Sequence, residues 1–294
     1  MQVFNPNDPN VAMLEQIARS LGPELCSQLV FVGGAAAGLL ITDLAMPPIR
    51  RTDDVDIVTN VEALADYYRF EDQFRGLGFV QDQSPDAPVC RWRLDGVSVD
   101  LMPTKEEILG FANRWYCLGM ATAQTLTLPS GLPTRVLRAP EFIATKLEAF
   151  YGRGGGDYLF SHDMGDIISV IDGRASLLNE CQESLAPLRG YLAAQFQHLL
   201  TDRHFVGALP GHLPPDGASQ ARLPDLLIKI QHTFQRWPFY ECLAHTRKLR
   251  FNFVGRCARS RGLISPYEQN RSDEFFRLRV GRGGQAQEGG ASQP

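Results

Sequence analysis

A diglycine followed by an acidic pair constrains this chain more than any other feature. Gly33-Gly34 closes a short apolar stretch, and Asp54 and Asp56 stand two residues apart at the start of the next one. Side chains of a strand alternate between its faces, so both aspartates project from one face while the residues between and after them pack behind. Two neighbouring carboxylates repel each other unless a cation neutralises them. The pattern therefore predicts a metal site on a strand.

A third carboxylate lies on an amphipathic strand predicted over residues 97–102. Asp100 alternates there with Val97, Val99 and Leu101, so it projects from the opposite face to these apolar residues. If this strand lies beside the strand with the acidic pair, three carboxylates converge. Such a set suits Mg²⁺ or Mn²⁺ shared with substrate phosphates, with the third carboxylate as further ligand or base. The alternative is that Asp100 is a surface residue.

Residues that precede the acidic pair suit a triphosphate. Gly33 and Gly34, at a predicted strand-to-helix junction, let the backbone approach phosphates, and the helix that follows offers amide donors. No Gly-Lys-Ser/Thr follows them, which excludes a P-loop. Arg51 and Thr52 are candidates for phosphate contacts. The alternative interpretation is that Arg51 is a cation at the edge of a strand and Thr52 an ordinary strand residue.

Two predicted helices carry charged residues on their apolar faces. The helix over residues 141–151 has Lys146 in the middle of its apolar face, where a lysine must snorkel or point into a cavity. The helix over residues 161–171 has Asp163 inside its apolar stripe, whereas Asp166 is predicted to be peripheral. An acid and a base on core-facing stripes indicate a buried pair or a shared site, or a pair that simply holds two helices together.

The order of the predicted elements indicates an α+β fold. Strand signals end near residue 138, and helices dominate after it. We therefore predict an α/β domain over residues 1–138, a helical domain over 139–240 and a basic, partly disordered tail over 241–294. The glycine-rich loop around Arg153 is interpreted as a connector. The strands are predicted over residues 28–32, 54–59, 90–94, 97–102, 125–128 and 135–137, with a two-residue hairpin turn at Asp95-Gly96. The helices are predicted over 11–21, 34–44, 61–77, 141–151, 161–171, 176–200 and 223–237, with a stop at Gly22-Pro23 after the first and a break near Pro187.

Composition excludes several classes of protein. With 44% hydrophobic and 21% charged residues and a net charge of −4, the chain is typical of an ordinary soluble domain. Its longest apolar run is too short for a bilayer, no secretory signal is evident, and the six cysteines have no paired spacing. We expect a cytoplasmic protein. Residues 247–282 hold ten Lys/Arg and three Asp/Glu, which is typical of a nucleic-acid-contacting tail or of a solvated end.

Together these motifs resemble the nucleotidyltransferase (polymerase-β-like) superfamily. The signature of this superfamily is an apolar residue before a diglycine, followed by Asp-x-Asp and then by a later carboxylate. More narrowly, the chain is similar to the AbiEii-type nucleotidyltransferases of bacterial abortive-infection and toxin–antitoxin systems, over roughly residues 28 to 172. The matching positions are Gly33, Gly34, Arg50, Thr52, Asp54, Asp56, Asp100, Lys146, Asp163 and Asp166.

The resemblance implies the small mixed sheet of the nucleotidyltransferase fold, flanked by helices and followed by a helical part. It implies metal-dependent transfer of a nucleoside monophosphate from a nucleoside triphosphate to a hydroxyl of an RNA end or a protein side chain. A cognate antitoxin is an implied partner, and a membrane is not. The alternative is a non-catalytic nucleotide-binding regulatory or antitoxin-like protein.

Each site residue has an expected role under this resemblance. Mg²⁺ or Mn²⁺ would bind the three carboxylates, and Asp163 would orient Lys146 or the acceptor. The expected metal ligands are Asp54, Asp56 and Asp100, and the expected contacts to the nucleotide are Gly33, Gly34, Arg51, Thr52 and Lys146.

Overall fold

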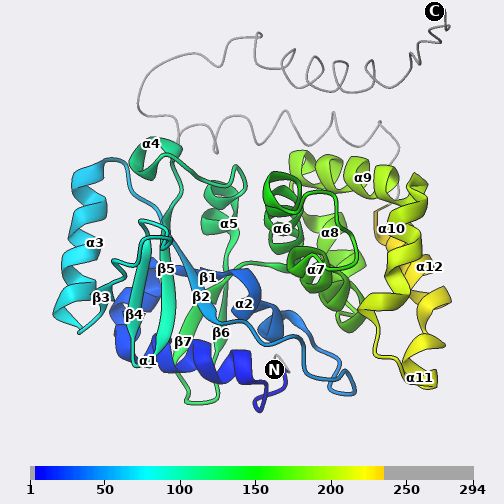
Figure 1. Cartoon of the computed structure of the whole chain (residues 1–294), viewed down its shortest axis with the longest axis horizontal. Helices are drawn as coiled ribbons and strands as arrows, with labels where there is room; N and C mark the ends of the chain where they lie inside the picture. Colours follow the sequence, from blue (N-terminus) through cyan, green and yellow to red (C-terminus); the bar gives the residue numbers. More distant parts are fainter. Residues whose placement is uncertain (1–3, 235–294) are drawn as a thin grey trace, which may run out of the picture. The chain divides into compact units, whose positions relative to one another are not determined.

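The computed structural model describes residues 4–234 and has the predicted α+β fold, with a mixed sheet, flanking helices and a helical C-terminal part (Figure 1). The predicted basic tail over 241–294 lies outside the described residues. The strands are β1 (Val30–Val32), β2 (Asp54–Thr59), β3 (Val80–Gln81), β4 (Arg91–Leu94), β5 (Val97–Pro103), β6 (Gln124–Thr127) and β7 (Pro133–Val136). The helices are α1 (Pro9–Gln28), α2 (Gly33–Leu40), α3 (Leu64–Gly76), α4 (Glu106–Leu109), α5 (Tyr116–Thr122), α6 (Ala139–Arg153), α7 (His162–Gly173), α8 (Leu177–Glu183), α9 (Ala186–Thr201), α10 (Arg203–Ala208), α11 (Gly217–Gln220) and α12 (Leu223–Thr233), with a 3₁₀ turn over Leu209–His212.

The seven strands form one sheet in the order β3-β4-β5-β2-β1-β7-β6. The central strand β2 is parallel to β5 and antiparallel to β1. The register pairs Asp54 with Ser98 and Asp56 with Asp100. Paired residues project from the same face of a sheet, so the predicted proximity of the two acidic strands is confirmed.

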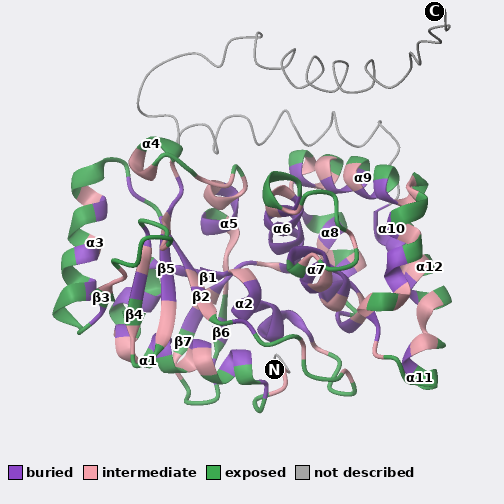
Figure 2. Cartoon of the chain, viewed as in Figure 1, coloured by how far each residue is buried: buried purple, intermediate pink, exposed green. Residues whose placement is uncertain are grey.

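The other face of these strands is apolar, and α3 packs against it at β4 and β5. Val55 pairs with Val99, and Val99 pairs with Trp92, and all three side chains are fully buried (Figure 2). Phe74 of α3 contacts Trp92 edge-on, with ring centroids 5.7 Å apart. The Tyr67 hydroxyl of the same helix donates to a β5 carbonyl, that of Leu101, at 2.8 Å. Burial of these large side chains fixes which face of β2 carries the aspartates.

The first helix differs from its predicted form. Residues 11–21 lie within a longer helix, α1, and Gly22 kinks it rather than ending it. Gly22 has φ +75°, a conformation that favours glycine. Pro23 then occupies the first turn of the second helical segment, where its missing N–H is tolerated. The predicted stop at Gly22-Pro23 therefore corresponds to this kink, after which a second helical segment continues to Gln28.

Other boundaries follow the prediction more closely. The strand over 54–59 and the hairpin turn at Asp95-Gly96 are as predicted. Helices α2 and α3 are shorter than predicted, and the predicted helix over 176–200 is divided into α8 and α9 close to its predicted break at Pro187. The short elements β3, α4, α5, α10 and α11 were not predicted.

The change from strands to helices falls where the domain boundary was predicted. Strand β7 ends at Val136, α6 begins at Ala139, and no strand follows among the described residues. Helix α2 packs against both α6 and α7, which join the helical part to the sheet. The division into two domains at residue 138 stays a prediction. None of the helices in residues 4–234 has the length and apolar character that a bilayer crossing requires.

Asn10 of α1 holds the segment that leads into β2. Its Nδ2 donates to the Arg50 carbonyl at 3.0 Å, and its Oδ1 accepts the Thr52 N–H at 2.9 Å. Asn10 is fully buried, so the hydrogen bond to Thr52 is shielded from water and the one to Arg50 is partly shielded. They fix the backbone next to Asp54, the first residue of β2.

We predict that Asn10→Ala destabilises the fold by about 2 kcal/mol or more, because it leaves the buried Thr52 N–H and the partly buried Arg50 carbonyl unpaired. Urea denaturation measures this free energy of unfolding. Asn7→Ala, at an exposed position nearby, serves as the control and should change stability by no more than about 0.5 kcal/mol. Equal losses for the two variants would contradict the anchoring role.

Candidate functional site

A cleft of about 980 Å³ is lined by both parts of the described chain. The carboxylate face of β2 and β5 contributes one wall, and α6 and α7 contribute another. Its size is within the range of small-molecule sites in proteins. Among its lining residues are Gly34, Arg50, Thr52, Asp54, Asp56, Arg91, Asp100, Lys146, Arg153 and Asp163.

Three carboxylates converge in this cleft. One oxygen atom from each of Asp54, Asp56 and Asp100 lies within 4.8 Å of the others. Burial, together with the negative charges of Asp54 and Asp100, raises the pKa of Asp56 to about 7. The sheet thus holds like charges together, at the cost of their mutual repulsion.

The donor set fits a hard divalent cation. All three ligand atoms are carboxylate oxygens, which Mg²⁺ and Mn²⁺ accept. Among the described residues, no donor forms a hydrogen bond to the Asp56 carboxylate, so both of its oxygens are available to a cation. We take these three residues as the candidate metal centre.

Arg91 partly neutralises the centre, and the sequence analysis missed it. Its Nε and Nη2 donate to the two oxygens of Asp100, each at 2.8 Å, and Nη2 also reaches Asp54 at 3.2 Å. The hydrogen bond to Asp100 holds the pKa of Arg91 above its usual value. The predicted Asp95-Gly96 turn contains the signal, because a two-residue hairpin turn there pairs residue 91 with residue 100.

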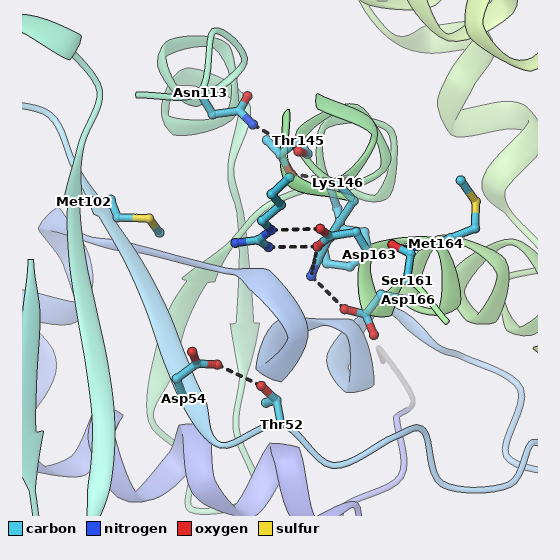
Figure 3. Close-up of polar contacts among 12 residues, drawn as sticks. Thr52, Asp54, Met102, Asn113, Thr145, Lys146, Ser161, Asp163, Met164 and Asp166 are labelled. Atoms are coloured by element: carbon cyan, nitrogen blue, oxygen red, sulfur yellow. Dashed lines mark hydrogen bonds and ion pairs between the residues drawn. The ribbon is translucent and has the colours of Figure 1, made fainter. Parts of the chain in front are cut away.

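Thr52 forms a hydrogen bond to the first residue of the acidic pair. Its hydroxyl donates to Asp54 at 2.8 Å (Figure 3), and its side chain is buried. Arg51, predicted to contact phosphate, is exposed and lies outside the lining of the cleft, whereas its neighbour Arg50 lines it. The position of Arg51 gives that prediction no support.

The diglycine makes room for the carboxylates. Gly33 has φ +66°, and a Cβ on it would lie 1.7 Å from Oδ2 of Asp56. Gly34 lines the cleft between Thr52 and Asp166, with 3.3 and 3.4 Å from its ideal Cβ to the nearest atom of each. Only glycine therefore fits position 33 while Asp56 keeps its place. Contact of either glycine with phosphate stays a prediction.

Lys146 lies between two aspartates of α7. Its Nζ is 3.1 Å from Asp163 and 2.7 Å from Asp166 (Figure 3), and all three residues are at most 7% exposed. Burial alone would lower the pKa of Lys146, but the two carboxylates outweigh it and hold this pKa above its usual value. The predicted contact of Lys146 with Asp163 is present. The prediction that Asp166 is peripheral is wrong, because three residues along a helix return to nearly the same side.

Arg153 completes this group. It is the last residue of α6, and its Nε and Nη2 donate to the two oxygens of Asp163, each at 3.0 Å. Burial would raise the pKa of Asp163, but its hydrogen bonds and ion pairs with Arg153 and Lys146 outweigh this effect and hold the pKa below its usual value. The glycine-rich segment was interpreted as a connector, yet its arginine is fixed at the cleft while its side chain remains 73% exposed.

Comparison with known proteins adds little to this description. No family model matches the chain, and no curated protein matches it. One solved structure that it resembles is the crystal structure of JHP933 from Helicobacter pylori, with a TM-score of 0.39 and 12% identity, over 83% of this chain and 97% of that one.

We predict that Gly33→Ala destabilises the protein much more than Gly96→Ala. Both positions have positive φ, which costs a residue with a Cβ about 1–2 kcal/mol. Gly96 has open space around it, whereas at Gly33 the Asp56 carboxylate must also move. Chemical denaturation of the two variants measures the difference. A loss for Gly33→Ala no larger than that for Gly96→Ala would show that Asp56 does not occupy the place described.

We also predict that Lys146→Met costs about 3–5 kcal/mol, because it leaves two buried carboxylates without their shared cation. Lys105→Met is the matched control, since Lys105 pairs with Glu62 at the surface and its loss should cost about 1 kcal/mol or less. Thermal and urea unfolding measure both variants. The deficit of Lys146→Met should shrink as the pH falls and Asp163 becomes protonated, because its ion pair with Lys146 is part of what keeps its pKa low in the unaltered protein. A deficit independent of pH would contradict the account.

Proposed function

We propose that this protein is a metal-dependent nucleotidyltransferase, which moves a nucleoside monophosphate from a nucleoside triphosphate to a hydroxyl acceptor. The observation that supports this most is the convergence of Asp54, Asp56 and Asp100 in a cleft that Lys146 and Arg153 also line. Carboxylates for a hard cation and cationic side chains for phosphates are what phosphoryl chemistry requires. The resemblance noted in the sequence supports the same class of reaction.

Each group has a role in this proposal. Asp54, Asp56 and Asp100 would hold Mg²⁺ or Mn²⁺, which when bound neutralises charge on the triphosphate. Lys146 and Arg153 place positive charge at the helical wall of the cleft. The acceptor oxygen forms a bond to the α-phosphorus. The bond between the α-phosphorus and the oxygen that links it to the β-phosphate breaks, so that pyrophosphate leaves. The hydroxyl proton passes to the carboxylate centre.

The acceptor and partners rest on the resemblance. It suggests the 3′ end of an RNA or a protein side chain as acceptor, in a cytoplasmic toxin with a cognate antitoxin. The cleft has room for a nucleotide and part of an acceptor at about 980 Å³.

A second candidate function is nucleotide binding without transfer, as in a regulatory or antitoxin-like protein. The observation that favours it is Arg91, whose guanidinium already occupies both oxygens of Asp100. A fixed cation at that carboxylate reduces its capacity to bind a metal ion.

Transfer of label from nucleoside triphosphates tests the first function directly. The full chain is incubated with each α-³²P-labelled triphosphate and Mg²⁺, together with total RNA or cell lysate. The proposal predicts a labelled polymer that disappears when EDTA replaces Mg²⁺. Magnesium-dependent nucleotide binding without any labelled product would favour the second function instead.

We predict that Asp56→Asn reduces transfer about a hundredfold or more while the free energy of unfolding stays the same or rises. The substitution removes a ligand, but it also removes a buried charge with two like charges beside it. Label incorporation and urea denaturation measure the two effects. Asp86→Asn, at an exposed position away from the cleft, should retain full activity and stability. Full transfer by Asp56→Asn would exclude Asp56 as a metal ligand in the reaction.

A further inference from the structure

Arg91 lies inside the acidic centre as a cation fixed by the fold. Residue 91 of β4 is paired in register with Asp100 of β5, so their side chains leave the sheet on one face. The guanidinium bonds Asp100 through two parallel hydrogen bonds and reaches Asp54 with the same Nη2. This two-point geometry is the strong form of an arginine–carboxylate pair.

The charges of the cleft divide into two sets with different balances. On the helical wall, Lys146 and Arg153 balance Asp163 and Asp166, so this set is neutral. At the sheet, the cation that pairs with the carboxylates is Arg91, which reaches Asp54 and Asp100. With all groups ionised, the sheet set has a net charge of −2, which a single divalent cation neutralises.

The hydrogen bonds show which oxygens remain for that cation. Both oxygens of Asp100 accept from Arg91, and the two oxygens of Asp54 accept from Thr52 and Arg91. Asp56 accepts no such bond among the described residues. A metal ion therefore finds its free ligand at Asp56, with the remaining lone pairs of the other two carboxylates beside it.

We propose that Arg91 takes the place of a second metal ion, so that the centre binds one divalent cation through Asp56 and its neighbours. The inference rests on the proposed metal centre and deepens it. Arg91 shares carboxylate oxygens with the metal and repels it, so its presence limits both the number of ions and their affinity.

This role predicts an effect opposite in sign to that of a positioning residue. If Arg91 only held Asp100 in place, its removal would weaken metal binding. If Arg91 competes for the oxygens, its removal frees Asp100 and strengthens metal binding. The free protein should at the same time lose stability, because three carboxylates then face each other without a cation.

Mn²⁺ binding to the full chain, measured by electron paramagnetic resonance of the unbound ion, distinguishes these roles without nucleotide or turnover. We expect one Mn²⁺ for the unaltered protein. For Arg91→Gln we expect two Mn²⁺, the first bound at least about tenfold more tightly, and a lower unfolding temperature in EDTA that Mn²⁺ raises more than in the unaltered protein. Arg93→Gln is the control, because Arg93 lies two residues along the same strand and pairs with Asp82 instead; it should bind like the unaltered protein.

Each other outcome contradicts a definite part of the account. Two Mn²⁺ bound by the unaltered protein, or weaker binding by Arg91→Gln, would overturn the role of Arg91 and leave the metal centre intact. Absence of binding in every variant would overturn the metal centre and with it the proposed function. If Arg91→Gln does not fold, Arg91→Lys keeps the charge without the paired hydrogen bonds; it should still bind one Mn²⁺, and two would overturn the inference.

Discussion

The parallel pairing of β2 with β5 is the constraint on which the rest of this site depends. It sets Asp56 directly opposite Asp100 and leaves Asp54 two residues away on the same face. The fold must then accommodate three like charges within 4.8 Å of one another. It does so sterically through Gly33, whose missing side chain leaves room for Asp56, and electrostatically through Arg91. Burial of the apolar face beneath α3 supplies the free energy that holds this arrangement together.

The two charge sets of the cleft explain why metal and phosphate would meet there. The helical set is neutral, and all of its members except Arg153 are buried, so it places Lys146 at the cleft without leaving an unpaired charge in the core. The sheet set keeps an excess of negative charge and attracts cations. A nucleoside triphosphate with its divalent ion suits a cleft that has the neutral helical set on one wall and the negative sheet set on the other. The same contrast makes Arg91 informative, because it shows how far the protein itself neutralises the centre.

Much of the fold and part of the site could be predicted from local patterns. The β2 strand and the Asp95-Gly96 hairpin follow from alternation and turn chemistry, and the contact of Lys146 with Asp163 follows from their places on two apolar stripes. The rest depends on relations between distant segments. Asp166 was assigned to the periphery although it shares the partner of Asp163, Lys146 of another helix. Arg91 escaped notice because its importance lies in strand register rather than in its neighbours along the chain. The need for glycine at position 33 likewise depends on Asp56 of another strand, because a Cβ there would collide with its carboxylate.

The central claim is that Asp54, Asp56 and Asp100 hold a divalent cation beside nucleotide phosphates. A crystal structure of the protein with Mn²⁺ and a non-hydrolysable nucleoside triphosphate tests it most directly, with anomalous scattering locating the metal. The account predicts a manganese peak in contact with Asp56 and a phosphate oxygen, at the face of β2 and β5. A triphosphate bound elsewhere, or bound in this cleft with no manganese at the three carboxylates, would contradict it.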